Sequence, residues 1–165
     1  KKKKKNNPRK LTLFYTIFLY LYINQNTMLG YFESIIPYTN GGKLPYWLLF
    51  ISVVSIFNSV QTYQNINLTK RVYEKNPNQV SPLSARTFGT WTLITSIVRF
   101  YGAYYLQNKQ IYELTQFTFA IAAWHFLSEW LYFGTCKLGK GLSGPLIVSS
   151  VSLVWMYLQK DFYVN

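Results

Sequence analysis

His125 is the sequence's single histidine, and it lies four residues before a carboxylate, Glu129. On a helix this spacing puts both side chains on one face, where a histidine and a carboxylate can pass a proton to a reacting group. No nucleophile or other reacting partner accompanies the pair. Counted by depth from the following loop, Glu129 is level with two amides of an earlier apolar segment, Asn58 and Gln61. These four residues are a candidate intramembrane polar cluster, and structural hydrogen bonding is favoured over catalysis.

Residue types argue against metal, disulfide and nucleotide chemistry. One histidine excludes a centre built from two or three histidines of this chain, and one cysteine, Cys136, excludes an internal disulfide or a multi-cysteine zinc site. Residues 139–144 match G-x-G-x-x-G, but no strand precedes them, so the dinucleotide fingerprint lacks its context. Cys136 is either a palmitoylation site or, the favoured alternative, an inert thiol. The sequence predicts no catalytic residue, no metal and no cofactor.

The composition describes a chain that is poor in charge and rich in apolar side chains. Charged residues make up 13% of the 165 residues and aromatic residues 19%, whereas an ordinary soluble domain has about 25% charged residues. This composition excludes disorder and argues against a well-solvated enzyme. Seven of the seventeen basic residues lie within positions 1–10, and the others are not clustered on a polar face. Nucleic-acid binding is therefore disfavoured.

Four long apolar segments explain the low charge. A helix of about 20 residues crosses the ~30 Å core of a bilayer, and aromatic residues mark the segment ends as interfacial anchors do. Four buried helices of a soluble protein are the alternative, but they would leave almost no polar surface. The sequence predicts an all-α fold, a polytopic membrane four-helix bundle with short loops. The expected spans are about 44–64, 87–106, 111–133 and 142–158.

The expected domain plan has three parts. Residues 44–163 form the four-transmembrane-helix domain, and residues 28–43 are an N-terminal segment. Residues 1–27 are an atypical basic and apolar extension. They are either the charged and apolar regions of a signal segment or upstream sequence joined by a gene model, with Met28 as the initiator. The second alternative is favoured.

Lysine and arginine counts predict the orientation. The first and third loops hold six of these residues against three on the opposite side, if translation starts at Met28, so both loops are expected in the cytoplasm. Including the basic tail reverses the count. A glycosylation sequon, Asn67-Leu68-Thr69, lies in the first loop and is usable only from the lumen. The cytoplasmic-loop candidates are Lys70, Arg71, Arg86, Lys137 and Lys140.

Two segments carry stripes of small and polar side chains. Small residues on one face let membrane helices approach closely, and an ionisable group at membrane depth is by default a functional candidate. Packing within the bundle is favoured, and docking against another protein's helix is the alternative. The stripe residues are Ser52, Ser55 and Ser59 in the first segment, and Thr92, Ser96 and Arg99 in the second.

Four stretches of the chain carry a family resemblance, which covers about 120 of the 165 residues. They are LPYWLLFISVVSIFNSVQTY (44–63), LSARTFGTWTLITSIVRFYGAYYL (83–106), HFLSEWLYFGTCKLGKG (125–141) and GPLIVSSVSLVWMY (144–157). In these stretches the chain resembles the ergosterol biosynthetic protein 28 family. Residues 1–27 depart from the family pattern.

The resemblance implies a multi-pass protein of the endoplasmic reticulum membrane without known catalysis. The family tethers the sterol C-4 methyl oxidase, the C-3 sterol dehydrogenase/C-4 decarboxylase and the 3-keto sterol reductase, and the sterol C-24 methyltransferase is associated with it. The expected function is a non-catalytic scaffold in ergosterol biosynthesis. The alternative is a small sterol- or lipid-binding or transport membrane protein, with Arg99, Glu113, His125 and Glu129 lining a cavity. Membrane lipid is an expected partner, and self-association is left open.

Overall fold

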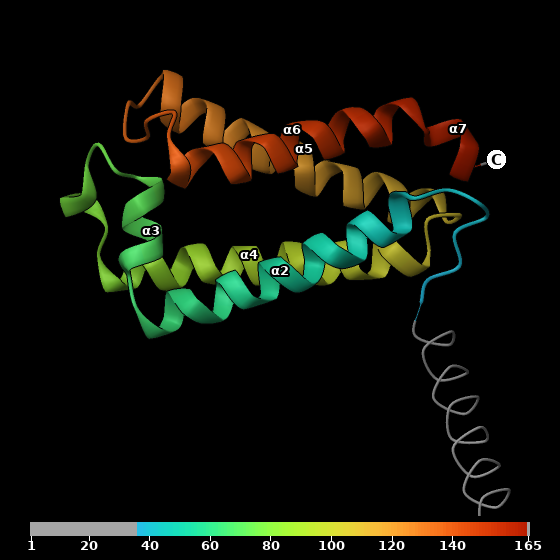
Figure 1. Ribbon diagram of the computed structural model, residues 1–165, viewed down its shortest axis with the longest axis horizontal. Coiled ribbons are helices and arrows are strands. Elements are labelled where there is room, and N and C mark those ends of the chain that lie inside the picture. The colour runs from blue at the N-terminus through green and yellow to red at the C-terminus, as the bar shows by residue number, and fades with distance from the viewer. Residues whose placement is uncertain (1–35, 165) are drawn as a thin grey trace, which may run out of the picture. The chain divides into compact units, whose positions relative to one another are not determined.

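The computed structural model describes residues 36–164 (Figure 1). The chain divides into two compact units after Pro37, and nearly all described residues belong to the second unit. The predictions for residues 1–27 lie outside the described residues, as does most of segment 28–43.

Four long helices make up most of this unit, together with two short helices and a 3-10 helix, η1. Residues 36–164 contain no β-strand, which confirms the all-α prediction. The long helices are α2 (Leu44–Gln64), α4 (Pro82–Tyr104), α5 (Lys109–Leu131) and α6 (Lys140–Leu158). The short elements are α3 (Asn67–Val72), η1 (Pro77–Gln79) and α7 (Lys160–Tyr163).

Helix α4 begins earlier than predicted, at Pro82 rather than at residue 87. The Ser81 hydroxyl accepts a hydrogen bond from the Ser84 amide at 3.1 Å, and the Ser84 hydroxyl accepts one from the Ser81 amide at 2.9 Å. Such a capping box satisfies amide groups that a helix start leaves free. Proline fits the first helical position because its missing N–H is not needed there. Ser81 and Pro82 therefore start a helix.

The long helices associate as two antiparallel pairs, α2 with α4 and α5 with α6, and α4 also packs on α5 (Figure 1). A buried apolar core joins the pairs at the end where α7 lies, and it includes Leu48, Tyr112 and Met156. At the other end α3 packs on α6, and a second core includes Val72, Phe126 and Cys136. The helix pairs are thus tied together at both ends.

Two of the long helices, α2 and α6, are long and apolar enough to cross a membrane. Length and composition alone also fit the core helices of soluble proteins. Both helices, however, expose large apolar side chains: Phe57 of α2 is 66% exposed and Leu158 of α6 is 73% exposed. Contiguous exposed apolar surface is typical of contact with a membrane or a partner. These two helices indicate membrane association. Helices α4 and α5 do not meet the same criterion.

Candidate functional site

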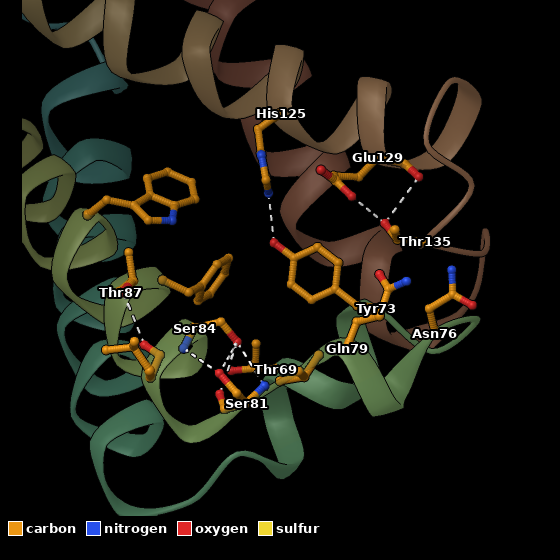
Figure 2. Close-up of a pocket in the computed structure, with 14 residues that line it drawn as sticks. Thr69, Tyr73, Asn76, Gln79, Ser81, Ser84, Thr87, His125, Glu129 and Thr135 are labelled. Atoms are coloured by element: carbon orange, nitrogen blue, oxygen red, sulfur yellow. Dashed lines mark hydrogen bonds between the residues drawn. The ribbon is translucent and has the colours of Figure 1, made fainter.

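His125 lies at the end of the unit where α3 crosses between the helix pairs. Its Nε2 atom is hydrogen-bonded to the Tyr73 hydroxyl at 2.7 Å (Figure 2). The imidazole also makes edge contacts with the rings of Trp91 and Tyr73. These groups border a cavity of about 500 Å³ between α3, η1, the first turns of α4 and the end of α5. Hydroxyl and amide groups line much of it, among them Thr69, Asn76, Gln79, Ser84 and Thr135.

The Tyr73 phenol keeps its proton across the physiological range. Burial raises the pKa of Tyr73 well above its usual value, and the nearby Cys136 and Glu129 raise it further. A protonated phenol can donate to a neutral imidazole nitrogen. The pair is therefore suited to hold a ring in place or to bind a polar ligand group, rather than to supply a strong base.

Glu129 holds the loop that follows α5. Its carboxylate accepts a hydrogen bond from the Thr135 hydroxyl, and its backbone carbonyl accepts the Thr135 amide at 2.9 Å. The chain reverses at Gly134, whose φ of 66° is in the left-handed region that favours glycine. Cys136 is buried in this loop, and burial raises the pKa of its thiol. A protonated buried thiol is a poor nucleophile.

The structure does not bring the four residues of the predicted polar cluster together. Among the described residues, no hydrogen bond joins His125 or Glu129 to Asn58 or Gln61, and both amides are exposed on α2. The reason is the helix pairing: α2 packs on α4, and α3 with its following residue, Tyr73, approaches α5 instead. A depth counted from a loop does not say which helices are neighbours, and the neighbours of α5 decide which polar groups reach His125 and Glu129.

Arg99 is an interior residue that joins α4 to α5. Its side chain is 6% exposed; Nε donates to the Thr118 hydroxyl at 3.0 Å and Nη2 to the Thr118 carbonyl at 3.2 Å. The guanidinium lies over the Phe119 ring, 4.1 Å from its centroid, a cation–π geometry. Arg99 is therefore not on a surface that a partner helix can reach.

The small-residue stripes pack inside the unit. Ser52, Ser55, Ser59 and Ser96 are buried, and Thr92 is half-buried. The Ser59 hydroxyl donates to the Gly89 carbonyl at 2.6 Å and so links α2 to α4. The hydroxyls of Ser52, Thr92 and Ser96 instead donate to carbonyls of their own helices. The stripes serve helix packing, so any docking surface has to be sought among the exposed side chains.

The five cytoplasmic-loop candidates all lie at the end of the unit that holds α3 and the α5–α6 loop (Figure 1). The Lys75 amide donates to the Thr135 carbonyl at 3.2 Å and connects the two loops. On the opposite end Lys160 pairs with Glu113 at 2.9 Å. The grouping of Lys70, Arg71, Arg86, Lys137 and Lys140 is a structural fact, whereas their cytoplasmic side stays a prediction.

Three polar partners were not predicted from the sequence: Tyr73 for His125, Thr135 for Glu129 and Thr118 for Arg99. Val72 and Tyr73 were a usable signal, because two adjacent large side chains in an otherwise polar loop indicate that the loop packs on something. Thr115 and Thr118 repeat at helical spacing within α5 and mark a polar strip facing α4. No comparable signal points to Thr135.

Within residues 36–164, no group of three histidine, cysteine or carboxylate side chains is arranged to hold a metal ion. The polar side chains of the interior are mostly engaged with one another or with backbone groups. The fold and the site define a helical protein with apolar, membrane-length helices and a hydrogen-bonded polar interior.

Comparison with known proteins identifies the family. The family model described as "Erg28 like protein" matches residues 44–154. The chain belongs to this family. No solved structure matches it.

Relatives from fungi and animals carry closely similar names. "Ergosterol biosynthetic protein 28" of Candida albicans is 99% identical over 138 residues, which are 84% of this chain and 100% of the relative. The Saccharomyces cerevisiae protein of the same name is 58% identical over 75% of this chain and 84% of its own length. "Ergosterol biosynthetic protein 28 homolog" of Homo sapiens is 39% identical over 67% of this chain and 79% of its own length.

Proposed function

We propose that the chain is a non-catalytic scaffold of the endoplasmic reticulum membrane that acts in ergosterol biosynthesis. It holds the sterol C-4 methyl oxidase, the C-3 sterol dehydrogenase/C-4 decarboxylase and the 3-keto sterol reductase together, with the sterol C-24 methyltransferase as a further partner. Tethering consecutive enzymes raises their effective concentration for one another's products. An apolar intermediate is then captured before it diffuses away in the bilayer.

The observation that carries this proposal is the outward direction of the apolar side chains on all four long helices. Helix α4 exposes Ile94 and Ile97, and α5 exposes Phe117, Ile121 and Trp124, although both helices also hold charged residues. In the middle of α4 and α5 the polar residues Ser96, Arg99, Thr115 and Thr118 are buried, whereas the polar residues near the start of α4, such as Arg86 and Thr90, are exposed. Apolar side chains outside and polar side chains inside are the reverse of the pattern in a soluble bundle. This arrangement supports four membrane-spanning helices whose outer surface contacts lipid and partner helices.

Co-purification tests the scaffold directly. The tagged chain is recovered from membranes in a mild detergent, and the bound proteins are identified by mass spectrometry. We expect joint recovery of the three C-4 demethylation enzymes, enriched about tenfold or more over a control bait, which corresponds to ~1.4 kcal/mol. The control bait is an unrelated multi-pass protein of the same membrane at equal abundance. Recovery of no more than the control amount contradicts the proposal.

Glycosylation of the first loop tests the orientation. Asn67 is exposed at the start of α3 and belongs to a sequon that only the lumenal machinery can modify. If the first loop is cytoplasmic, endoglycosidase treatment leaves the gel mobility of the chain unchanged. A sequon added after Asn165 is the control, since the carboxyl terminus is then lumenal and a mobility shift is expected. A shift at Asn67 would reverse the assignment.

A further inference from the structure

A second cavity, of about 570 Å³, lies between the two helix pairs. Its volume is within the ~300–1,000 Å³ of small-molecule sites. Residues of α2, α3, α4, α5 and α6 all contribute to its wall. On α4 the wall runs from Phe88 to Arg99, about 16 Å at the rise of an α-helix. The cavity is therefore long enough for an extended or flat apolar body.

The cavity is open to the surface along parts of α2 and α6. Its lining includes Val54 and Asn58 of α2 and Gly144 of α6, all of which are exposed. These are the two helices that are long and apolar enough to cross a membrane. Where these two helices cross a membrane, a ligand that enters between them comes from the lipid.

The wall is mostly apolar, with side chains such as Ile51, Trp91, Phe126 and Val148. The charged residues Arg71, Glu74 and Lys140 also line it, and all three are exposed, whereas Arg99 is buried. Arg99 lines one end of it as a cation without a counter-charge. Among residues 36–164, the salt bridge joins Lys160 to Glu113, and no carboxylate pairs with Arg99. The hydrogen bonds from Arg99 to Thr118 use only part of the N–H donors of the guanidinium. A buried charge is strongly disfavoured unless it is paired.

Thr69 supplies a second unsatisfied group toward the other end. It is 2% exposed, it lines both cavities, and its hydroxyl oxygen has no hydrogen-bond partner. Buried hydroxyls are normally hydrogen-bonded, so an unsatisfied one next to a cavity indicates a missing partner. Arg99 and Thr69 come from different helices and border the same space.

We propose that this cavity binds a membrane lipid that has an apolar body and one carboxylate, which pairs with Arg99. A guanidinium binds a carboxylate through two parallel hydrogen bonds, and one cation neutralises one such group. The apolar body lies along Trp91, Phe126 and Val148. Long-chain fatty acids and sterol carboxylic acids share this chemistry. A sterol carboxylic acid in addition carries a ring hydroxyl at its far end, which would lie toward Thr69. The inference requires a membrane location but does not depend on the scaffold role.

Photolabelling of the full chain in its membrane tests the proposal. The probes are palmitic acid carrying a diazirine and an alkyne, and the methyl ester of the same molecule, which has no charge. We expect the acid to label the chain about tenfold more than the ester, on peptides from α2, α4 or α6. Excess unlabelled acid abolishes the labelling. Equal labelling by acid and ester overturns the proposal.

A blocking variant tests the site without touching the arginine. Val54 lines the cavity and is exposed on α2, so Val54→Trp adds bulk at the opening. We expect it to lose most of the acid labelling at unchanged protein level. Val53→Trp is the matched control, because Val53 is exposed on the same helix and does not line the cavity. Labelling that survives Val54→Trp places the ligand elsewhere and overturns the proposal.

Variants at Arg99 test the charge. Arg99→Met is expected to label equally with acid and ester, and Arg99→Lys to keep part of the preference for the acid. Competition then separates the two lipid sources. Stronger displacement by unlabelled 3β-hydroxy-5-cholenoic acid than by palmitic acid assigns a sterol carboxylate, and the reverse assigns a fatty acid. If Arg99→Met is still labelled more by the acid than by the ester, the Arg99 guanidinium is not the group that pairs with the ligand carboxylate.

Discussion

Replacing Gly141 with alanine is expected to lower the free energy of unfolding by about 2–3 kcal/mol. A Cβ at Gly141 would lie 1.9 Å from the backbone oxygen of Arg71 and 2.5 Å from its carbonyl carbon. A backbone carbonyl cannot rotate out of the way as a side chain can, so α3 has to move off α6. For a chain of this size, this loss of unfolding free energy lowers the midpoint temperature of thermal unfolding by roughly 5–10 °C. The shift is measurable on the purified protein in detergent.

Val151→Ala is the control for this experiment. Val151 lies in the same helix as Gly141 and is exposed. Alanine is a slightly better helix former than valine, so this variant should be close to neutral. Equal losses for the two variants would mean that the α3–α6 contact does not limit stability.

The Gly141 contact also bears on the His125 site. Helix α3 ends at Val72, and Tyr73 follows directly, so a displaced α3 carries the Tyr73 hydroxyl away from the imidazole. Burial against this end of the bundle is what raises the pKa of Tyr73. In Gly141→Ala the phenol should therefore titrate closer to its ordinary range. Ultraviolet absorbance above neutral pH, compared with that of a Tyr73→Phe variant, detects this change.

The sequence predicted the long helices well because their length and low charge are local properties. The first segment was placed at residues 44–64, and α2 spans Leu44–Gln64. The start of α4 was misplaced at residue 87, five residues after the Ser81-Pro82 pair that begins the helix. A serine followed by proline is the signature of a helix start. The pattern of Ser81 and Ser84, three residues apart, would have placed the start there.

The polar contacts could not be predicted, because they depend on which helices become neighbours. His125 and Glu129 were correctly placed on one helix, but their partners come from a loop end and a reverse turn, Tyr73 and Thr135. Neither contact follows from helical spacing. Arg99 was noted as an unusual buried charge, whereas its bond to Thr118 required knowing that α4 packs on α5.

The second large effect is expected at the contact between α2 and α4. A Cβ at Gly89 would lie 1.9 Å from the Thr62 hydroxyl oxygen and 3.1 Å from the Ser59 carbonyl oxygen. The Thr62 hydroxyl donates to that carbonyl at 2.6 Å. Gly89→Ala has to push this hydroxyl off its acceptor or separate the helices. Leaving a buried hydroxyl unpaired costs about 1–3 kcal/mol, so we expect a loss of about 2 kcal/mol in thermal unfolding experiments.

A double-mutant cycle separates a local clash from a general intolerance of α4 to substitution. Thr62→Ala removes the group that the new Cβ would meet, so the double variant with Gly89→Ala should regain most of the stability that Gly89→Ala loses. The coupling energy between the two sites is then expected to be about 1–3 kcal/mol, the range for residues in contact. If the losses of unfolding free energy from the two single variants simply add in the double variant, the close contact of α2 and α4 at Gly89 does not limit stability. Strong coupling would mean that glycine at position 89 sets the distance between α2 and α4. The serine stripe then acts through packing within the chain, and the surface left for partners is the outer, apolar one.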